Sequence, residues 1–337
     1  MKREKLVKNI IIFIILIAFT FVFVFKNYDI KSTISIIQNS NVLYIVIAFF
    51  IMSLYFFLEA FNIRNVLQAL GNKIKMLPCL KYPIIGFFFS GITPAASGGQ
   101  PLEIYFMKKD NIKVSDSTIA LLIELSCFQL ITIACGVAGA IINHKLLLTG
   151  FIWVFIIGIT LNSLALTVIL ICFISPETSE VLRDLLIKIM KGLRIKNIDS
   201  KKEKIDQTIE DYKKGAVFIK TNKTVLIKSL FIVFLQVILY YLIPVCVYKA
   251  LGLSGQSILH IMTIYAMLYI SVSSIPIPGT VGINEASFLK IFALVFTVEK
   301  ISSAMILNRF ISFYIFVIIG MITTYITINR KGREYYE

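Results

Sequence analysis

Two stretches rich in proline and glycine decide the fold of this chain: TPAASGGQP at residues 93–101 and PIPGTVG at residues 276–282. We call them the first break and the second break, because each interrupts a long apolar run. Proline lacks the backbone N–H that a helix needs, and glycine adopts conformations that other residues avoid. Backbone groups left unpaired in this way cannot face lipid, so the breaks must contact protein or line a polar cavity. They predict a transport site.

The composition places the chain among membrane proteins. Hydrophobic residues make up 58% of it, charged residues only 16%, and the mean hydropathy is +0.85. About 20 apolar residues suffice for a helix to cross the hydrocarbon core. Full spans are therefore expected at residues 10–25, 42–61, 117–142, 146–174, 225–250 and 302–328. We expect an all-α polytopic membrane protein with six full transmembrane helices.

Two shorter apolar segments predict hairpins that enter the membrane and return. Residues 82–93 are too few to cross a bilayer and run straight into the first break, which indicates a re-entrant hairpin over residues 82–109. Residues 258–275 and 283–298 flank the second break and predict a second hairpin over 258–298, with a full crossing of 258–275 as the alternative.

The two hairpins divide the chain into similar halves. Pro94 and Gly98 have the same spacing as Pro278 and Gly282. The expected organisation is an N-terminal half at 1–174, a cytoplasmic amphipathic linker at 175–223 and a C-terminal half at 224–337. Because the hairpins are expected to enter from opposite sides, the halves form an inverted repeat, a plan that places a transporter's substrate site near the midplane.

The positive charge predicts orientation rather than a nucleic-acid partner. The net charge is +15, and the expected loops place most of the 34 Lys and Arg on one side of the membrane. Such asymmetry marks the cytoplasmic side. We therefore expect a multi-pass protein of the plasma membrane, with both termini in the cytoplasm and no nucleic-acid binding.

Charges inside the expected spans are the next candidates for function. Glu124 and Arg309 each lie about eight residues into the helix that follows a hairpin, and an ionised side chain at that depth usually has a partner. We expect Glu124 to pair with Arg309 or with charges on a substrate, although a purely structural ion pair stays open. Glu59 has a simpler interpretation, because Arg64 is close to it near the end of a span.

The breaks also predict short helices whose first turns could hold an anion. Helix N-termini present free amides and partial positive charge, and neighbouring polar side chains add hydrogen-bonding groups. Carboxylates in these first turns, Glu103 and Glu285, could instead satisfy the amides or bind a cationic group. The candidate substrate-binding residues are Thr93, Pro94, Ser97, Gly98, Gly99, Gln100, Glu103, Glu124, Pro278, Gly279, Gly282, Asn284, Glu285 and Arg309.

Other chemistry has little support in the sequence. The five cysteines are scattered and the two histidines are isolated, so neither a metal site nor a cofactor is expected. No nucleotide-binding loop is present, which leaves passive exchange and ion coupling both open. Gly136 and Ala140 form a small-residue surface that suits either internal helix packing or a homo-oligomer.

The motifs of the two breaks resemble those of the transmembrane flippase domain of the lysylphosphatidylglycerol synthase family, the membrane half of the multiple peptide resistance factor. The resemblance rests on TPAASGGQP at 93–101, YFMKK at 105–109 and PIPGTVGINE at 276–285, and it covers essentially the whole chain. The chain departs from the family pattern in two places. It has Gln100 and Glu103 where many relatives have Gly-Glu and a later Arg. It has Leu125 after Glu124, where relatives commonly have an Arg. These changes bear on the head group more than on the fold.

The resemblance implies that the chain moves a phosphatidylglycerol-type or aminoacylated phospholipid between leaflets, with a link to resistance against cationic antimicrobial peptides. The family label also implies a phosphatidylglycerol lysyltransferase. Because the chain ends soon after its last expected span, we expect no soluble transferase domain and no catalysis by this polypeptide alone. Membrane phospholipids are the expected partners, with a separate lipid-modifying synthase also open. The alternatives are an ion-coupled transporter of a small solute and the membrane component of a lysylphosphatidylglycerol synthase.

Overall fold

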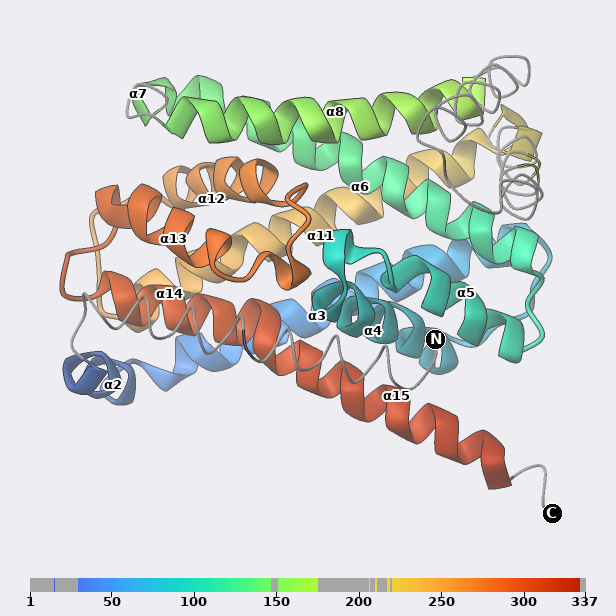
Figure 1. Cartoon of the computed structure of the whole chain (residues 1–337), viewed down its shortest axis with the longest axis horizontal. Coiled ribbons are helices and arrows are strands. Elements are labelled where there is room, and N and C mark those ends of the chain that lie inside the picture. The colour runs from blue at the N-terminus through green and yellow to red at the C-terminus, as the bar shows by residue number, and fades with distance from the viewer. Residues whose placement is uncertain are drawn as a thin grey trace.

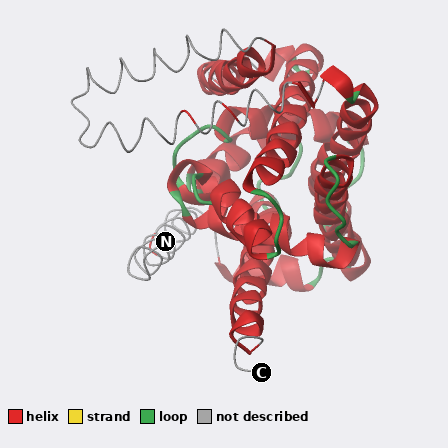
Figure 2. Ribbon diagram, turned by 90° about the vertical axis from the view of Figure 1, so that its right-hand side faces the viewer, coloured by secondary structure: helices red, strands yellow, loops and turns green. Residues whose placement is uncertain are grey.

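The computed structural model describes residues 15, 30–146, 151–174, 206, 210, 217, 218 and 220–333. Every regular element among these residues is a helix, and Figure 2 shows helices joined by loops. Two expectations fall outside this set: the first span at 10–25, apart from Ile15, and most of the amphipathic linker at 175–223.

Within the part of the chain that the structure describes, five helical stretches are long and apolar enough to cross a membrane. They are α3 (Val42–Ala69), α6 (Val114–Ile142), α8 (Ile152–Ile174), α11 (Lys223–Ala250) and a final stretch built from α14 (Ile301–Arg309), a π-helical turn (Phe310–Tyr314) and α15 (Ile315–Arg333). A helix of 28 residues rises about 42 Å, more than the hydrocarbon core requires. Five of the six expected spans are thus confirmed as long apolar helices.

Polar residues fix where several helices begin. Asn41 precedes α3, and its Oδ1 accepts a hydrogen bond from the backbone N–H of Leu43 at 3.0 Å. Ser257 precedes α12 (Ile258–Val272), and its Oγ accepts from the N–H of His260 at 3.1 Å. Both caps satisfy amides that a helix start leaves unpaired. The short helices α2 (Ile30–Gln38) and α7 (His144–Leu146) complete the bundle.

Each break separates two shorter helices, as predicted. Around the first break these are α4 (Met76–Ile92), a 3-10 turn at Pro94–Ala96 and α5 (Gly99–Lys109). Around the second they are α12, a 3-10 turn at Pro278–Thr280 and α13 (Ile283–Ile291), which a further 3-10 turn extends over Phe292–Leu294.

The first hairpin starts earlier than the sequence predicted. Helix α4 begins at Met76, not at residue 82, and continues through Lys81 and Pro83. The reason is tertiary: Lys81 forms an ion pair with Asp110 just after α5, and Tyr82 donates its hydroxyl to the same carboxylate at 2.7 Å. A charge that is satisfied in this way does not end the helix.

The two hairpins approach each other from opposite ends of the bundle. In Figure 1, α4 and α5 lie in the right half of the molecule, α12 and α13 lie in the left half, and the chain reverses near the middle in both. The 3-10 turns of the two breaks contact each other, while α3 and α11 pack along one another through the centre. This arrangement puts both breaks at one place.

The first helix of each hairpin is held by a long helix from the other end of the chain. Helix α12 packs against α6, and α4 packs against α15. Glycine permits both contacts: a Cβ on Gly139 would lie 2.6 Å from the carbonyl oxygen of Thr263, and one on Gly320 would lie 2.6 Å from that of Ile84. Gly136 likewise faces Ile270 of α12, so this small-residue surface serves internal packing.

Candidate functional site

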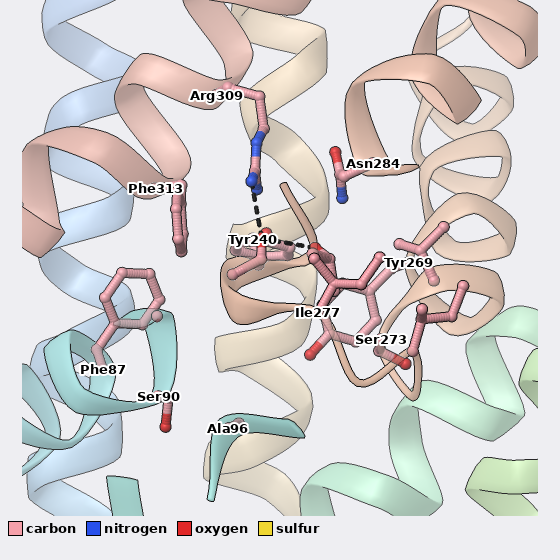
Figure 3. A pocket seen from close by; sticks show the side chains of 15 residues that line it. Phe87, Ser90, Ala96, Tyr240, Tyr269, Ser273, Ile277, Asn284, Arg309 and Phe313 are labelled. Carbon is pink, nitrogen blue, oxygen red and sulfur yellow. Dashed lines mark hydrogen bonds between the residues drawn. The ribbon is translucent and has the colours of Figure 1, made fainter. Parts of the chain in front are cut away.

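A cavity of about 160 Å³ lies between the two breaks. Figure 3 shows side chains from both hairpins and from the long helices converging on it. Its wall combines aromatic rings with a small number of polar groups, the usual character of a small-molecule site. The lining residues that Figure 3 labels are Phe87, Ser90, Ala96, Tyr240, Tyr269, Ser273, Ile277, Asn284, Arg309 and Phe313.

Arg309 supplies the positive charge at this cavity. Its Nε donates to Oε1 of Glu285 at 2.7 Å, and its Nη2 donates to the carbonyl oxygen of Gly279 at 2.9 Å. Only 4% of the Arg309 side chain and 2% of the Glu285 side chain are exposed. The guanidinium also lies 4.3 Å from the ring centroid of Phe313. These contacts hold it in one orientation.

Glu285 organises the start of α13 as well as the arginine. Its Oε2 accepts from the backbone N–H of Gly282 at 2.7 Å, and its Oε1 accepts from the hydroxyl of Tyr314 at 3.1 Å as well as from Arg309. A first-turn carboxylate therefore satisfies an amide of this helix, one of the two roles expected for it. Arg309 and Tyr314 are five residues apart and would point about 140° apart on an α-helix. The π-helical turn between them brings both to the same carboxylate.

The second break needs its glycines for this geometry. Gly279 has φ +56° and Gly282 has φ +91°, values that favour glycine. A Cβ on Gly279 would also meet the ring of Phe313, with its Cε1 at 2.9 Å. The break therefore places the Gly279 carbonyl beside Arg309 only because no side chain intervenes.

The first break is held by a threonine. The hydroxyl of Thr93 donates to the carbonyl oxygen of Phe89 at 2.6 Å and accepts from the N–H of Gly98 at 2.9 Å. These bonds close the turn between α4 and α5. Helix α5 then starts at Gly99 without a side-chain cap, so its first amides are not taken by a carboxylate as those of α13 are.

Few of the predicted residues line the cavity itself. Gly279, Asn284 and Arg309 do so. Asn284 is buried, and its Oδ1 has no hydrogen-bond partner in the protein. The other predicted residues at and just after the second break, Pro278, Gly282 and Glu285, do not line it. Among those of the first break, Pro94 and Ser97 are exposed, Gly99 is buried, Gln100 is half-buried, and Thr93 and Gly98 shape the turn.

The expected pairing of Glu124 with Arg309 is wrong. Arg309 pairs with Glu285, whereas Oε2 of Glu124 accepts a hydrogen bond from the Nδ2 of Asn62. The separation follows from the fold: Glu285 lies on the helix next to α14, while α6 carries Glu124 toward α3 and the first hairpin. A closer carboxylate therefore takes the guanidinium.

Glu124 instead belongs to a group of three acidic residues, which we call the carboxyl cluster: Glu59, Glu103 and Glu124. The charge of Glu59 interacts with those of Glu124 and Glu103, and that of Glu103 with Glu124. The expected neighbour of Glu59 is occupied elsewhere, because Arg64 donates its Nε to the carbonyl oxygen of Ile74 at 3.2 Å. Among the described residues, no group of three His, Cys, Asp or Glu is placed to hold a metal ion.

Sequence reasoning missed the tyrosines that form one wall of the cavity. Tyr240 of α11 lies between Tyr265 and Tyr269 of α12, with ring centroids 5.6 Å from each. The only signal in the sequence is the spacing of Tyr265 and Tyr269, which places both on one face of a helix. Tyr240 could not be assigned to that face without the tertiary contact.

Comparisons with known proteins agree with this architecture. Residues 9–320 match the model of a family described as the lysylphosphatidylglycerol synthase TM region. Over 307 residues the chain is 23% identical to a UPF0104 membrane protein from Archaeoglobus fulgidus, an alignment that covers 89% of this chain and 91% of that protein. Both similarities extend across the two breaks and the cavity between them.

Proposed function

Because the chain belongs to the lysylphosphatidylglycerol synthase transmembrane-region family, we propose that it moves a phospholipid of the phosphatidylglycerol type, or an aminoacylated derivative, between leaflets. The family supports a membrane protein of lipid metabolism, and the lipid-moving role is our interpretation of the cavity. The head group would enter the cavity between the breaks, while the acyl chains stay in lipid.

The observation that carries this proposal is the buried guanidinium at the cavity wall. Arg309 donates two of its N–H groups to Glu285 and Gly279. An arginine has five such donors in a fixed fork, so its remaining edge is suited to the oxygens of a phosphate. Asn284 adds a buried amide whose oxygen has no partner in the protein, suited to a hydroxyl or amine of the head group.

The size and lining of the cavity favour a lipid over a wholly soluble substrate. A volume of about 160 Å³ accommodates a head group but not acyl chains. Aromatic rings such as Phe87 and Phe313, with centroids 5.7 Å apart, border the polar groups. This combination fits a molecule that is polar at one end and apolar at the other.

Two hairpins that enter from opposite ends provide a route for alternating access. In this proposal they are re-entrant, the halves form an inverted repeat, and rocking of one half against the other opens the cavity to each leaflet in turn. The distribution of basic residues supports a plasma-membrane location with cytoplasmic termini. A separate synthase would supply aminoacylated lipid, and movement of that lipid to the outer leaflet would reduce attraction of cationic peptides.

The test is lipid movement in reconstituted vesicles. Purified protein in vesicles of phosphatidylethanolamine and phosphatidylglycerol, carrying fluorescent phosphatidylglycerol, should expose the label to an outside quencher faster than protein-free vesicles do. Arg309→Ala should slow this at least tenfold, because a charged hydrogen bond is worth about 1.5–3 kcal/mol. Lys223→Ala, at the exposed start of α11, is the matched control. Equal rates for wild type, Arg309→Ala and empty vesicles would refute the proposal.

The same vesicles separate the alternatives. An ion-coupled transporter of a small solute would leave the fluorescent lipid unaffected and accumulate solute under a sodium or proton gradient. A synthase would convert phosphatidylglycerol to a new lipid species when charged tRNA is supplied.

A further inference from the structure

The carboxyl cluster lacks positive partners although it lies deep in the bundle. Its members come from α3, α5 and α6; Glu103 and Glu124 are 6% and 7% exposed, and Glu59 is half-buried. Across residues 30–146 and 220–333 none of the three forms an ion pair with a basic side chain. Buried carboxylates are normally paired, because an isolated charge costs many kcal/mol in a medium of low dielectric. The carboxyl groups avoid this cost only if something other than a basic side chain neutralises them.

The cluster and the amides that contact it have fewer hydrogen-bond donors than acceptors. Asn62 donates its Nδ2 to Glu124, and Gln236 donates its Nε2 to Oε2 of Glu59 at 3.2 Å. Both amides are fully buried, and their other ends, Oδ1 of Asn62 and Oε1 of Gln236, have no donor; nor does Oε2 of Glu103. Three buried acceptors, two of them on the neighbouring amides and one on Glu103 itself, therefore have no donor. Leaving such atoms unsatisfied costs about 1–3 kcal/mol each.

A proton bound to a carboxyl group would supply both the missing positive charge and a missing hydrogen-bond donor. A protonated carboxyl group is neutral, and its O–H is a donor. Two or three carboxylates close together also repel each other, which favours the protonated form of at least one of them. A metal ion fits less well, because the three groups do not converge on a point that an ion could occupy.

Tyrosines connect the carboxyl cluster with the cavity. The Tyr55 side chain interacts with Glu59, and its ring centroid is 5.6 Å from that of Tyr240. Tyr240 is in turn 5.6 Å from Tyr269, and both line the cavity. A continuous row of tyrosine side chains therefore runs from the cluster to the proposed head-group site.

The remaining titratable neighbours do not neutralise the cluster. The thiols Cys79 of α4 and Cys127 of α6 interact with Glu103 and Glu124, respectively. The two nearest arginines are engaged elsewhere, Arg64 by the carbonyl oxygen of Ile74 and Arg309 by Glu285. The three carboxyl groups are thus left to share protons among themselves.

We propose that Glu59, Glu103 and Glu124 form a proton-binding site that exchanges protons with the cavity and couples proton movement to substrate movement. The coupling rests on the proposed lipid transport, whereas the proton binding does not. On release, the O–H bond of a carboxyl group breaks and the proton passes to water in the cavity. On uptake the reverse occurs from the opposite side.

Infrared difference spectroscopy tests the proton binding without any transport. The wild-type protein, in vesicles of phosphatidylethanolamine and phosphatidylglycerol near neutral pH, should show the C=O stretching band of a protonated carboxylic acid. The amplitude of that band should fall in Glu103→Gln. In Glu124→Gln the pH range over which the band disappears should change. Glu299→Gln, at an exposed loop position, is the matched control. Spectra that are identical for wild type, Glu103→Gln and Glu124→Gln would overturn the proposal, because the carboxyl groups would then be ionised.

An imposed pH gradient tests the coupling. With one proton per lipid, a gradient of one pH unit shifts the distribution of fluorescent phosphatidylglycerol between leaflets by up to about tenfold. Glu103→Gln should abolish this shift, whereas the control Glu299→Gln should retain it. If the wild type exchanges lipid but the gradient does not shift its distribution, the coupling is overturned and the proposed function stays intact. A protein that moves no lipid, yet shows the carboxylic acid band, would overturn the proposed function and the coupling while supporting the proton site.

Discussion

The buried ion pair between Arg309 and Glu285 predicts a strong asymmetry between single and double substitution. Glu285→Ala removes the carboxylate that accepts from Arg309, Tyr314 and Gly282. It leaves a guanidinium almost wholly buried without its counter-charge, which destabilises a protein by about 3–5 kcal/mol. We expect a loss of that size in the free energy of unfolding.

The partner substitution should cost less, and the pair should recover much of the loss. Arg309→Met leaves a carboxylate that still accepts from Tyr314 and Gly282. In the double variant, Glu285→Ala with Arg309→Met, neither charge remains buried. The three variants together should yield a coupling energy of at least about 2 kcal/mol.

Unfolding in mixed micelles of increasing dodecyl sulfate content, followed by far-ultraviolet circular dichroism, measures these differences. Lys81→Met is the control, because its ion pair with Asp110 is about one-fifth exposed and should contribute under about 1 kcal/mol. If the losses of the two single variants simply add in the double variant, the ion pair does not couple these residues and the reasoning is refuted.

Three further predictions concern packing and hydrogen bonds. Gly279→Ala should lower stability by about 2–4 kcal/mol through strain and contact with an aromatic ring, whereas Gly252→Ala, at φ +68° with open space around it, should cost only about 1–2 kcal/mol; thermal unfolding compares the two. Gly320→Ala should separate two packed helices and cost about 1–3 kcal/mol, with a lower midpoint in the same assay. Tyr82→Phe removes the bond to Asp110 and should cost about 1 kcal/mol; an unchanged midpoint would contradict it.

The parts of the fold that the sequence predicted depend on local chemistry. Long apolar runs predicted five helices that the structure contains, and the missing N–H of Pro94 and Pro278 predicted where shorter helices stop. Such signals act within a few residues, so they need no knowledge of the tertiary fold. The start of the first hairpin was misplaced because Lys81 is satisfied by a residue beyond α5.

The parts that were missed depend on contacts between distant segments. Arg309 was identified, but its partner was assigned by symmetry to Glu124, whereas the nearer Glu285 takes it. Glu124 accepts a hydrogen bond from the amide of Asn62, and Glu59 accepts one from the amide of Gln236. Gln236 lies 177 positions along the chain from Glu59. Neutral amides inside apolar helices carry no pattern that announces such a contact.

The π-helical turn at Phe310–Tyr314 has a consequence for how this helix can change in length. Each residue of an α-helix advances it by about 100° around its axis. Deleting the outward-facing Phe310 would remove the extra residue that the turn accommodates, so Arg309 and Tyr314 would lie four residues apart, about 40° around a regular α-helix, and Gly320 would still face Ile84. Single-residue deletions should therefore be tolerated better at this turn than elsewhere in the last helix, where each deletion would rotate all following residues by about 100° and disrupt the packing of Gly320 against α4.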